Sequence, residues 1–420
     1  MVPAFFINLP ILAGMKILHT SDWHLGQKLL QLDRHAEFVL ALDWLFTTVE
    51  KEAVDVLLVA GDIFDIGNPP NQARQLYYNF LRRLLASSCR HVVITGGNHD
   101  SPAMLNAPRE LLQAFHIHVL GAATDNLADE LVVLRNVQGE PEMVIAAVPF
   151  LRDRDLRISR AGENQQERTD RLQQGLTDHY QQLAELAGPW QANNIPIVAM
   201  GHLYAKGAVA ADKQDNIYVG NRENMEAGQF PDLFSYVALG HIHRAQKIGE
   251  AEHIRYAGSL VPLSFSETKD EKLVNIVHFN GAAITQIEAL AVPTFRRLKT
   301  IQGNLAHVEA SLERFAARDN EELTPWVEVI VDTESYQPQL DQLLRDFTAD
   351  MRLELVKIRI NRPFESLTTS VADTPDLEFL DVEEVFQKKC TSQGDLDEAQ
   401  LEELTLTFRE LQNWMVERIA

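Results

Sequence analysis

Residues 92–100 read VVITGGNHD, and this stretch decides how the rest of the chain is interpreted. A run of β-branched residues ends at Thr95 and is followed at once by glycines, an amide, an imidazole and a carboxylate. Glycine, asparagine and aspartate would by themselves indicate a surface turn, but such a turn has no need of His99. The stretch therefore predicts a buried strand whose end carries side chains with a chemical role.

The same ending follows four other apolar runs of the chain. The blocks are SDWH (21–24), GDIFD (61–65), GNHD (97–100), GHLY (201–204) and GHIH (240–243). The runs before them, at 16–19, 54–60, 92–95, 197–200 and 236–239, are rich in Val, Ile and Leu and predict buried strands. Glycines in these blocks (Gly61, Gly97, Gly201 and Gly240) are expected to turn the backbone tightly, so that the next side chain points into a crevice.

Helical segments alternate with these strands. Residues 34–52, 72–86 and 166–186 carry apolar side chains at helical spacing. A β-α-β-α order predicts a layered α/β domain, and short alternating runs over 254–290 predict antiparallel strands at its end. Ligands bind at the carboxyl ends of the strands in such sheets, so we expect the five blocks to converge there.

The chain divides into five predicted parts. The first is apolar, contains two prolines, lacks a basic region and is too short to span a bilayer, so we expect a disordered extension. Beyond it we expect a catalytic domain, a small β-α-β-α-β module, a flexible linker and two amphipathic helices. The corresponding ranges are 1–14, 15–291, 292–365, 366–376 and 377–420.

The blocks together supply two aspartates, one asparagine and four histidines as candidate metal ligands: Asp22, His24, Asp62, Asn98, His202, His241 and His243. They exceed what one ion needs when water and substrate must also bind, so we expect two ions, with Asp62 as the bridge. Imidazole and carboxylate without thiolate favour Mn, Fe or Zn over a site for Ca or Mg alone. Two such ions would clamp a phosphoryl group and activate water for its displacement.

His99 is expected to act on the substrate. It directly follows the ligand Asn98, so its side chain would leave the metal pair and face the phosphate. There it would protonate the leaving oxygen or stabilise phosphoryl charge. Asp65 and Asp100 are expected to orient ligands by hydrogen bonds. The remaining histidines follow no such block and are interpreted as structural.

The composition limits the class of partner and the compartment. A chain of 420 residues with 45% hydrophobic content can form a large core in two or three folding units. Its net charge of −22 argues against a surface that is basic throughout, although it allows a local basic groove or a partner that supplies positive charge. Cys89 and Cys390 lie far apart, which indicates no disulfide framework and fits a reducing cytosol.

The five blocks in this order resemble the motifs of the calcineurin-like metallophosphoesterases. Within that superfamily, four longer stretches are similar to the nuclease subunits of bacterial SbcCD complexes, counterparts of the eukaryotic meiotic-recombination nuclease. They are HTSDWHLGQ (19–27), VAGDIFDIGNPP (59–70), YVALGHIHRAQ (236–246) and RYAGSLVPLSF (255–265). The likeness covers residues 15–290, whereas 295–362 matches the capping domain of that family only by position and pattern. It implies a β-sandwich flanked by helices, a small α+β capping domain and a C-terminal helical tail.

The resemblance also implies a ligand set and an activity. One Mn²⁺ would be bound by Asp22, His24, Asp62 and His243, and the other by Asp62, Asn98, His202 and His241, with Mg²⁺, Fe and Zn left open as alternatives; His99 would serve transition-state or leaving-group catalysis. The implied activity is phosphodiester hydrolysis in DNA: exonuclease action on duplex ends, driven by the ATP cycle of a partner, and endonuclease action on single strands and hairpins. It would serve DNA repair, recombination and replication.

The implied partner is an SbcC-type coiled-coil ABC ATPase, which would form a heterotetramer with a homodimer of the nuclease chain. Such an assembly would bind double- and single-stranded DNA without a membrane, in the cytoplasm at the nucleoid. The capping domain would contact DNA. We expect the amphipathic helices of 377–420 to dock the partner, the alternative being a helical pair folded onto the protein's own surface.

One stretch of the sequence offers contacts to DNA phosphates. FLRDRDLRISR (150–160) contains Arg152, Arg154, Arg157 and Arg160 beside the predicted catalytic domain. Its interleaved aspartates fit a solvated loop with local ion pairs equally well.

Two other functions remain open from the sequence. The first is hydrolysis of small phosphoesters or phosphoproteins on the same fold, which the module after residue 292 and the tail weigh against. The second is a scaffold that has lost catalysis, which would need neither a complete ligand set nor His99.

Overall fold

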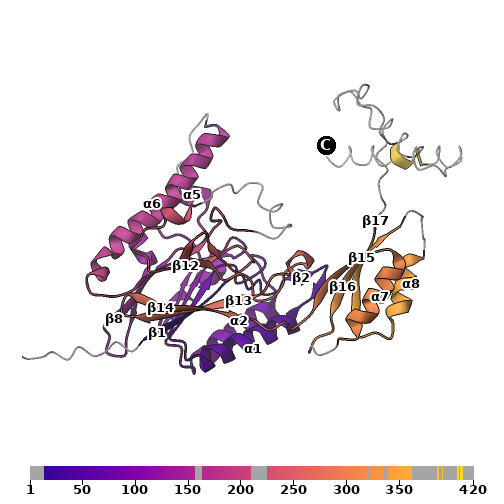
Figure 1. Ribbon diagram of the computed structural model, residues 1–420. Helices are drawn as coiled ribbons and strands as arrows, with labels where there is room; N and C mark the ends of the chain where they lie inside the picture. Colours follow the sequence, from indigo (N-terminus) through magenta and orange to yellow (C-terminus); the bar gives the residue numbers. More distant parts are fainter. Residues whose placement is uncertain are drawn as a thin grey trace, which may run out of the picture. The chain divides into compact units, whose positions relative to one another are not determined.

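The computed structural model describes residues 14–156, 163–209, 225–318, 322–333 and 339–361, together with 386, 390, 404, 405 and 407–409 (Figure 1). The predicted extension except Gly14, the linker, most of the C-terminal helices, Arg157 and Arg160 lie outside this part. The chain forms two compact units, Met1–Arg362 and Pro363–Ala420. No helix in the described part is both long enough and apolar enough to cross a bilayer.

The first sheet has six strands, and its central ones are parallel. In spatial order they are β14 (Ala283–Ala291), β13 (Leu273–Asn280), β1 (Met15–Thr20), β4 (Val56–Ala60), β5 (His91–Thr95) and β6 (Ile117–Leu120). β1, β4, β5 and β6 run parallel, whereas β13 pairs antiparallel with both β1 and β14. The antiparallel strands predicted at the end of the domain are thereby confirmed.

The second sheet also has six strands. In spatial order they are β11 (Gln246–Ile248), β12 (Ala251–Tyr256), β10 (Tyr236–Gly240), β9 (Ile197–His202), β8 (Pro141–Ala147) and β7 (Leu131–Arg135). The two sheets share a buried apolar layer to which Ile17, Leu58, Met200 and Ala238 contribute. The layered α/β fold is confirmed, and so are the two packed sheets of the β-sandwich that the family resemblance implied.

Helices cover the outer faces of both sheets (Figure 1). α1 (His35–Lys51) and α2 (Asn71–Leu84) pack on the first sheet, and α6 (Gln165–Gln191) packs on the second. α1 buries Phe38, Leu42, Leu45 and Val49, whose spacing of three or four residues places them on one face. Short helices α3 (Pro102–Asn106), α4 (Arg109–Gln113) and α5 (Asp153–Leu156) lie in the connections.

Three strands between residues 96 and 196 were not predicted from the sequence: β6, β7 and β8. β6 has only four residues, and its apolar run is interrupted by His118. β7 lies at a sheet edge, and its buried side chains alternate with half-buried or exposed ones. This alternation weakens the apolar run by which a strand is predicted from the sequence. β8 has a run of apolar residues like the predicted strands and was simply missed.

A small module follows the two sheets. β15 (Leu298–Gly303), β16 (Trp326–Asp332) and β17 (Glu354–Asn361) form a parallel three-stranded sheet. α7 (Leu305–Ala316) and α8 (Leu340–Thr348) connect its strands, in the predicted β-α-β-α-β order.

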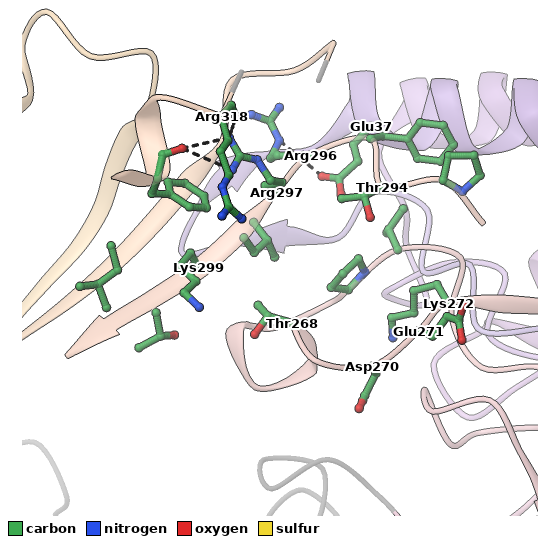
Figure 2. A pocket seen from close by; sticks show the side chains of 18 of the residues that line it. Glu37, Thr268, Asp270, Glu271, Lys272, Thr294, Arg296, Arg297, Lys299 and Arg318 are labelled. Carbon is green, nitrogen blue, oxygen red and sulfur yellow. Dashed lines mark hydrogen bonds and ion pairs between the residues drawn. The ribbon is translucent and has the colours of Figure 1, made fainter. Parts of the chain in front are cut away.

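The small module contacts the domain of the first sheet through apolar side chains and through one ion pair. Leu298 and Trp326 pack with Leu29 of the short hairpin β2–β3 (Lys28–Leu29, Leu32–Asp33) and with Phe265 of the 3₁₀ turn η3 (Phe265–Glu267). Arg296 lies over the Trp326 ring and 3.5 Å from the carboxylate of Glu37 in α1. A cavity of about 880 Å³ lies beside this junction (Figure 2).

Candidate metal centre

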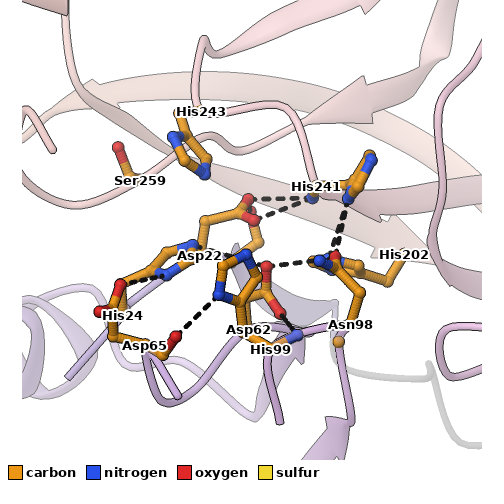
Figure 3. A network of polar contacts seen from close by, with 12 residues as sticks. Asp22, His24, Asp62, Asp65, Asn98, His99, His202, His241, His243 and Ser259 are labelled. Atoms are coloured by element: carbon orange, nitrogen blue, oxygen red, sulfur yellow. Dashed lines mark hydrogen bonds and ion pairs between the residues drawn. The ribbon is translucent and has the colours of Figure 1, made fainter. Parts of the chain in front are cut away.

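All five blocks converge at one edge of the two sheets (Figure 3). Asp22, Asp62 and Asn98 follow β1, β4 and β5 of the first sheet, whereas His202 ends β9 and His241 follows β10 of the second. The centre therefore lies where the carboxyl ends of parallel strands from two sheets meet.

The candidate ligand side chains fall into two groups. The ligand atoms of Asp22, His24 and His243 all lie within 4.8 Å of one another, as do those of Asp62, His202 and His241. Asn98 joins the second group, because its Oδ1 is 3.1 Å from His202 Nε2 and 3.0 Å from His241 Nδ1. We call these the first group and the second group.

Asp62 links the two groups. Its Oδ2 lies 3.5 Å from His24 Nε2 and 3.2 Å from His202 Nε2. Its Oδ1 accepts the backbone N–H of His99 at 2.9 Å, which fixes the orientation of the carboxylate. One oxygen therefore faces a histidine of each group, the position that a bridging ligand requires.

The donor atoms fit divalent cations. His24 Nε2, Asp62 Oδ2 and His243 Nε2 are buried and have no partner in hydrogen-bond geometry among the described residues, although Asp62 Oδ2 lies near two histidines. Buried polar atoms are nearly always paired, so three unpaired ones in one place indicate a missing partner. Imidazole nitrogens and a carboxylate oxygen are lone-pair donors that a metal ion would satisfy.

The backbone at the centre is held in an unusual conformation. Asp22, His24, Asp62 and His241 have positive φ angles of 49°, 47°, 50° and 98°. Such conformations cost on the order of 1–3 kcal/mol each and persist where neighbouring contacts enforce them. Here Asp22 N–H donates to Gly61 O at 3.1 Å, and His241 N–H donates to the Asp22 carboxylate at 2.9 Å. The blocks thus hold one another in place.

The glycines of the blocks serve two purposes, not the one expected. Gly61 does have a positive φ of 82°. At Gly97 the constraint is space, because a Cβ there would lie 2.1 Å from Asp62 Oδ1. The close approach of Asp62 therefore excludes any side chain at Gly97. Gly201 lies inside β9, so the tight turn expected at that glycine is wrong.

Asp62 stabilises positive charge on two histidines of the centre, whereas burial and the charge of His202 lower the pKa of His241 well below its usual range. Burial alone lowers the pKa of His202, but the charge of Asp62 outweighs it and raises that pKa to about 9. Burial likewise disfavours a charged His24, whereas its bond to Asp65 and the charge of Asp62 raise its pKa to about 9. Burial raises the pKa of Asp62, but His202 holds it well below its usual range. Metal binding would displace such protons.

His99 lies beside both groups without joining either ligand cluster. Its Nδ1 donates to the backbone carbonyl of Asp65 at 2.7 Å, because a carbonyl can only accept. The ring is half-buried, with its centroid 4.8 Å from that of His24. Nε2 is therefore the nitrogen left to face a substrate.

Asp65 and Asp100 contact different parts of the centre. Asp65 Oδ1 lies 3.2 Å from His24 Nδ1, so it can orient this ring while Nε2 stays free for a cation. The ligand atoms of His24, Asp65 and His99 also lie within 4.8 Å of one another, but His24 already belongs to the first group. The carboxylate of Asp100 accepts the backbone N–H groups of Ile63, Phe64 and Gly97. Asp100 thus links the backbone that directly follows Asp62 to the backbone that directly precedes Asn98.

Sequence reasoning missed Glu267 and Lys272. Glu267 Oε1 lies 3.3 Å from His243 Nδ1, and its Oε2 accepts from Lys272 Nζ at 2.7 Å. Burial raises the pKa of Glu267, but the bond from His243 and the charge of Lys272 hold it well below its usual range. Glu267 lies 24 residues beyond His243 and follows no strand-end block, so no pattern marked it.

The arginine-rich stretch is only partly described. Arg152 and Arg154 lie at α5, where Arg154 Nε is 3.6 Å from Asp155 Oδ1. Arg168 of α6 pairs with Asp153 at 2.7 Å. Arg157 and Arg160 lie outside the described residues, so phosphate contact and local ion pairing both stay open for this stretch.

Two protein families and several known proteins are similar to this chain. The calcineurin-like phosphoesterase family matches residues 15–245, and the family described as type 5 capsule protein repressor C-terminal domain matches 294–393. The SbcD subunit of the nuclease SbcCD from Escherichia coli (strain K12) is 38% identical over 94% of this chain and 97% of its own. The SbcD subunit from Rhodobacter capsulatus is 32% identical over 86% of this chain and 91% of its own. A solved dimetal phosphatase from Danio rerio is 14% identical, with 66% of this chain and 99% of that chain covered and a TM-score of 0.37.

Proposed function

The chain belongs to the SbcD family of calcineurin-like phosphoesterases, and from this premise we propose that it is the metal-dependent DNA nuclease subunit of an SbcCD-type complex. The observation that carries the proposal is the position of Asp62 Oδ2, which lies 3.5 Å from His24 Nε2 and 3.2 Å from His202 Nε2. A carboxylate between two histidine groups suits a pair of ions that share one ligand.

We assign the ligands as the two groups suggest. One ion would be held by Asp22, His24, Asp62 and His243, and the other by Asp62, Asn98, His202 and His241. Mn²⁺ is the proposed metal, although these ligands also suit Fe and Zn. Two divalent ions, when bound, would neutralise phosphoryl charge and activate water for in-line displacement.

His99 is the proposed catalytic residue of the chain itself. The bond from Nδ1 to Asp65 O holds the ring so that a proton on Nε2 can face the phosphate. From there it would stabilise phosphoryl charge or protonate the leaving oxygen. Its backbone N–H holds Asp62, so the same residue couples substrate contact to the bridging ligand.

We propose that DNA is held beside the centre by local basic side chains. Arg152, Arg154, Arg157 and Arg160 are candidates for phosphate contacts, with Arg157 and Arg160 outside the described residues. Exposed basic side chains also line the cavity at the small module: Lys299, Arg314 and Arg318 (Figure 2). A net charge of −22 is compatible with such local contacts and with a partner that carries further DNA-binding surface.

The proposed partner is a coiled-coil ABC ATPase of the SbcC type. The relatives from Escherichia coli and Rhodobacter capsulatus are SbcD subunits of SbcCD nucleases, which supports such a complex. We propose that residues 377–420 dock this partner and that two copies of this chain form a homodimer within a heterotetramer. The complex would act as exonuclease and endonuclease in DNA repair. It would be located at the cytoplasmic nucleoid.

Purified full-length protein with Mn²⁺ and a labelled hairpin DNA tests the proposal. We expect cleavage that is lost in Asp62→Asn and in His99→Ala. Cleavage of a small chromogenic phosphodiester but of no DNA would overturn the nuclease assignment in favour of a small-phosphoester enzyme. Metal binding without cleavage of either would indicate a scaffold. Co-purification from the native host would test the partner separately.

A further inference from the structure

We propose that Glu267, held by Lys272, is a positioning residue that fixes the tautomer and orientation of His243 and thereby sets the metal affinity of the first group. The proposal rests on the metal pair of the proposed function. It concerns two residues that no strand-end block contains.

The contact between Glu267 and His243 selects one tautomer of the imidazole. Glu267 Oε1 lies 3.3 Å from His243 Nδ1, and a carboxylate can only accept a hydrogen bond. Nδ1 must therefore carry the proton, which leaves a lone pair on Nε2. Within the part of the chain that the structure describes, this Nε2 is buried without a hydrogen-bond partner, and it belongs to the group with Asp22 and His24. A carboxylate behind a metal-binding histidine is the arrangement that orients the ring and increases its basicity.

Lys272 holds both Glu267 and the main chain of His243. Its Nζ donates to Glu267 Oε2 at 2.7 Å, to the His243 carbonyl at 3.0 Å and to Ser259 Oγ at 2.8 Å. The Glu267 and Lys272 side chains are only 3% and 6% exposed. The ammonium therefore compensates the buried carboxylate and ties ring and backbone of His243 to one framework.

The turn that carries Glu267 is anchored on its other side. Leu263 N–H donates to Glu267 Oε2 at 3.1 Å, which fixes the second oxygen of the carboxylate. Phe265, two residues before Glu267, packs with Leu298 and Trp326 of the small module. A short turn fixed at both ends gives the carboxylate little freedom to leave His243.

A purely structural role is the alternative, because removal of one partner from a buried ion pair destabilises a protein whatever its function. Glu142 provides a matched control. This carboxylate is 7% exposed, lies 3.3 Å from His91 Nε2 and also pairs with Arg90, but none of these residues belongs to the metal groups. Glu142→Gln therefore removes a buried carboxylate from a histidine and a cation elsewhere in the fold.

The test is Mn²⁺ titration of metal-free full-length protein, with free Mn²⁺ followed by electron paramagnetic resonance and folding by circular dichroism. Wild type should bind two ions. In Glu267→Gln one ion should bind about 10–100-fold more weakly while the other stays within about twofold of wild type. Glu142→Gln should lower Tm and leave both affinities unchanged. Glu267→Gln with Lys272→Met, which leaves no buried charge unpaired, keeps the test valid if the single variant does not fold; it should show the same selective loss.

Retention of both affinities in a folded Glu267 variant would overturn the inference, as would equal weakening in Glu142→Gln. Failure of the wild type to bind two ions would instead overturn the proposed function, and the inference with it. The wild-type titration thus separates the two failures.

Discussion

The two ligand groups of the centre are held in different ways. In the second group Asp62, His202 and His241 are all buried, and the outer nitrogen of His202, Nδ1, lies 3.0 Å from the backbone carbonyl of Ala60. In the first group His243 is half-buried, and the outer nitrogens of His24 and His243 contact the carboxylates of Asp65 and Glu267. A main-chain carbonyl thus contacts the outer nitrogen of a histidine in the second group, whereas side-chain carboxylates contact the outer nitrogens of both histidines in the first.

This difference teaches where the centre can be altered. A main-chain contact inside two packed sheets can be removed only by disturbing the fold. A side-chain carboxylate can be replaced while the fold is kept. Substitutions outside the ligand set should therefore change the first group selectively, whereas the second group should respond only to changes in its ligands or in its packing.

The largest effect is expected at Asp62, the proposed ligand that faces a histidine of each group. Asp62→Asn weakens the donor that faces His24 and His202, so both ions should be lost together. DNA cleavage should fall by about 10⁴-fold or more, because several kcal/mol of charge stabilisation disappear. Metal content after dialysis and hairpin cleavage measure the two effects. Loss of a single ion would show that Asp62 does not bridge.

His99→Ala should separate catalysis from both groups. The His99 side chain contacts the carbonyl oxygen of Asp65 and belongs to neither ligand group. Its removal leaves the proposed ligands in place, so both ions should stay bound. Cleavage should fall by about 10²–10⁴-fold, the usual contribution of a proton-transfer group. Loss of metal along with activity would move His99 into the ligand set.

Gly97→Ala should disturb the shared ligand by crowding. The added Cβ would lie 2.1 Å from Asp62 Oδ1, so the carboxylate must shift, at a cost of about 1–3 kcal/mol in stability. Gly188→Ala in α6 is the matched control, because nothing lies within 4 Å of its Cβ and alanine favours a helix by about 1 kcal/mol. Thermal unfolding and Mn²⁺ titration should show Tm and affinity falling in the first variant and Tm rising slightly in the second. Equal behaviour of the two would remove the steric explanation.

The smallest effect is expected at Asp65. Its side chain is 29% exposed, so water can replace much of its contact with His24. Asp65→Asn should weaken one ion by about tenfold, at the low end for such outer contacts, and leave the second group unchanged. Isothermal titration with Mn²⁺ measures this. Weakening of both ions would contradict the separation of the two groups.

Much of the fold followed from local patterns. The strands of the five blocks, the three long helices and the β-α-β-α-β module were predictable because each buries a continuous run or a regular face. β6, at four residues, and the edge strand β7 carried too short or too mixed a pattern to detect. The ligand types were predictable for the same local reason, since each block stands directly after its strand.

The sequence by itself determined which side chains end the strands, and hence that imidazole and carboxylate would gather at a common edge. Only the tertiary structure decided which strands of each sheet meet at this edge, that one oxygen of Asp62 faces both groups, and that Glu267 reaches His243 across 24 residues of sequence. The physical reason is the distance along the chain between the residues that determine each feature. Strand and helix patterns depend on neighbours within a few residues, whereas these contacts depend on how distant strands and loops pack, which no local pattern encodes.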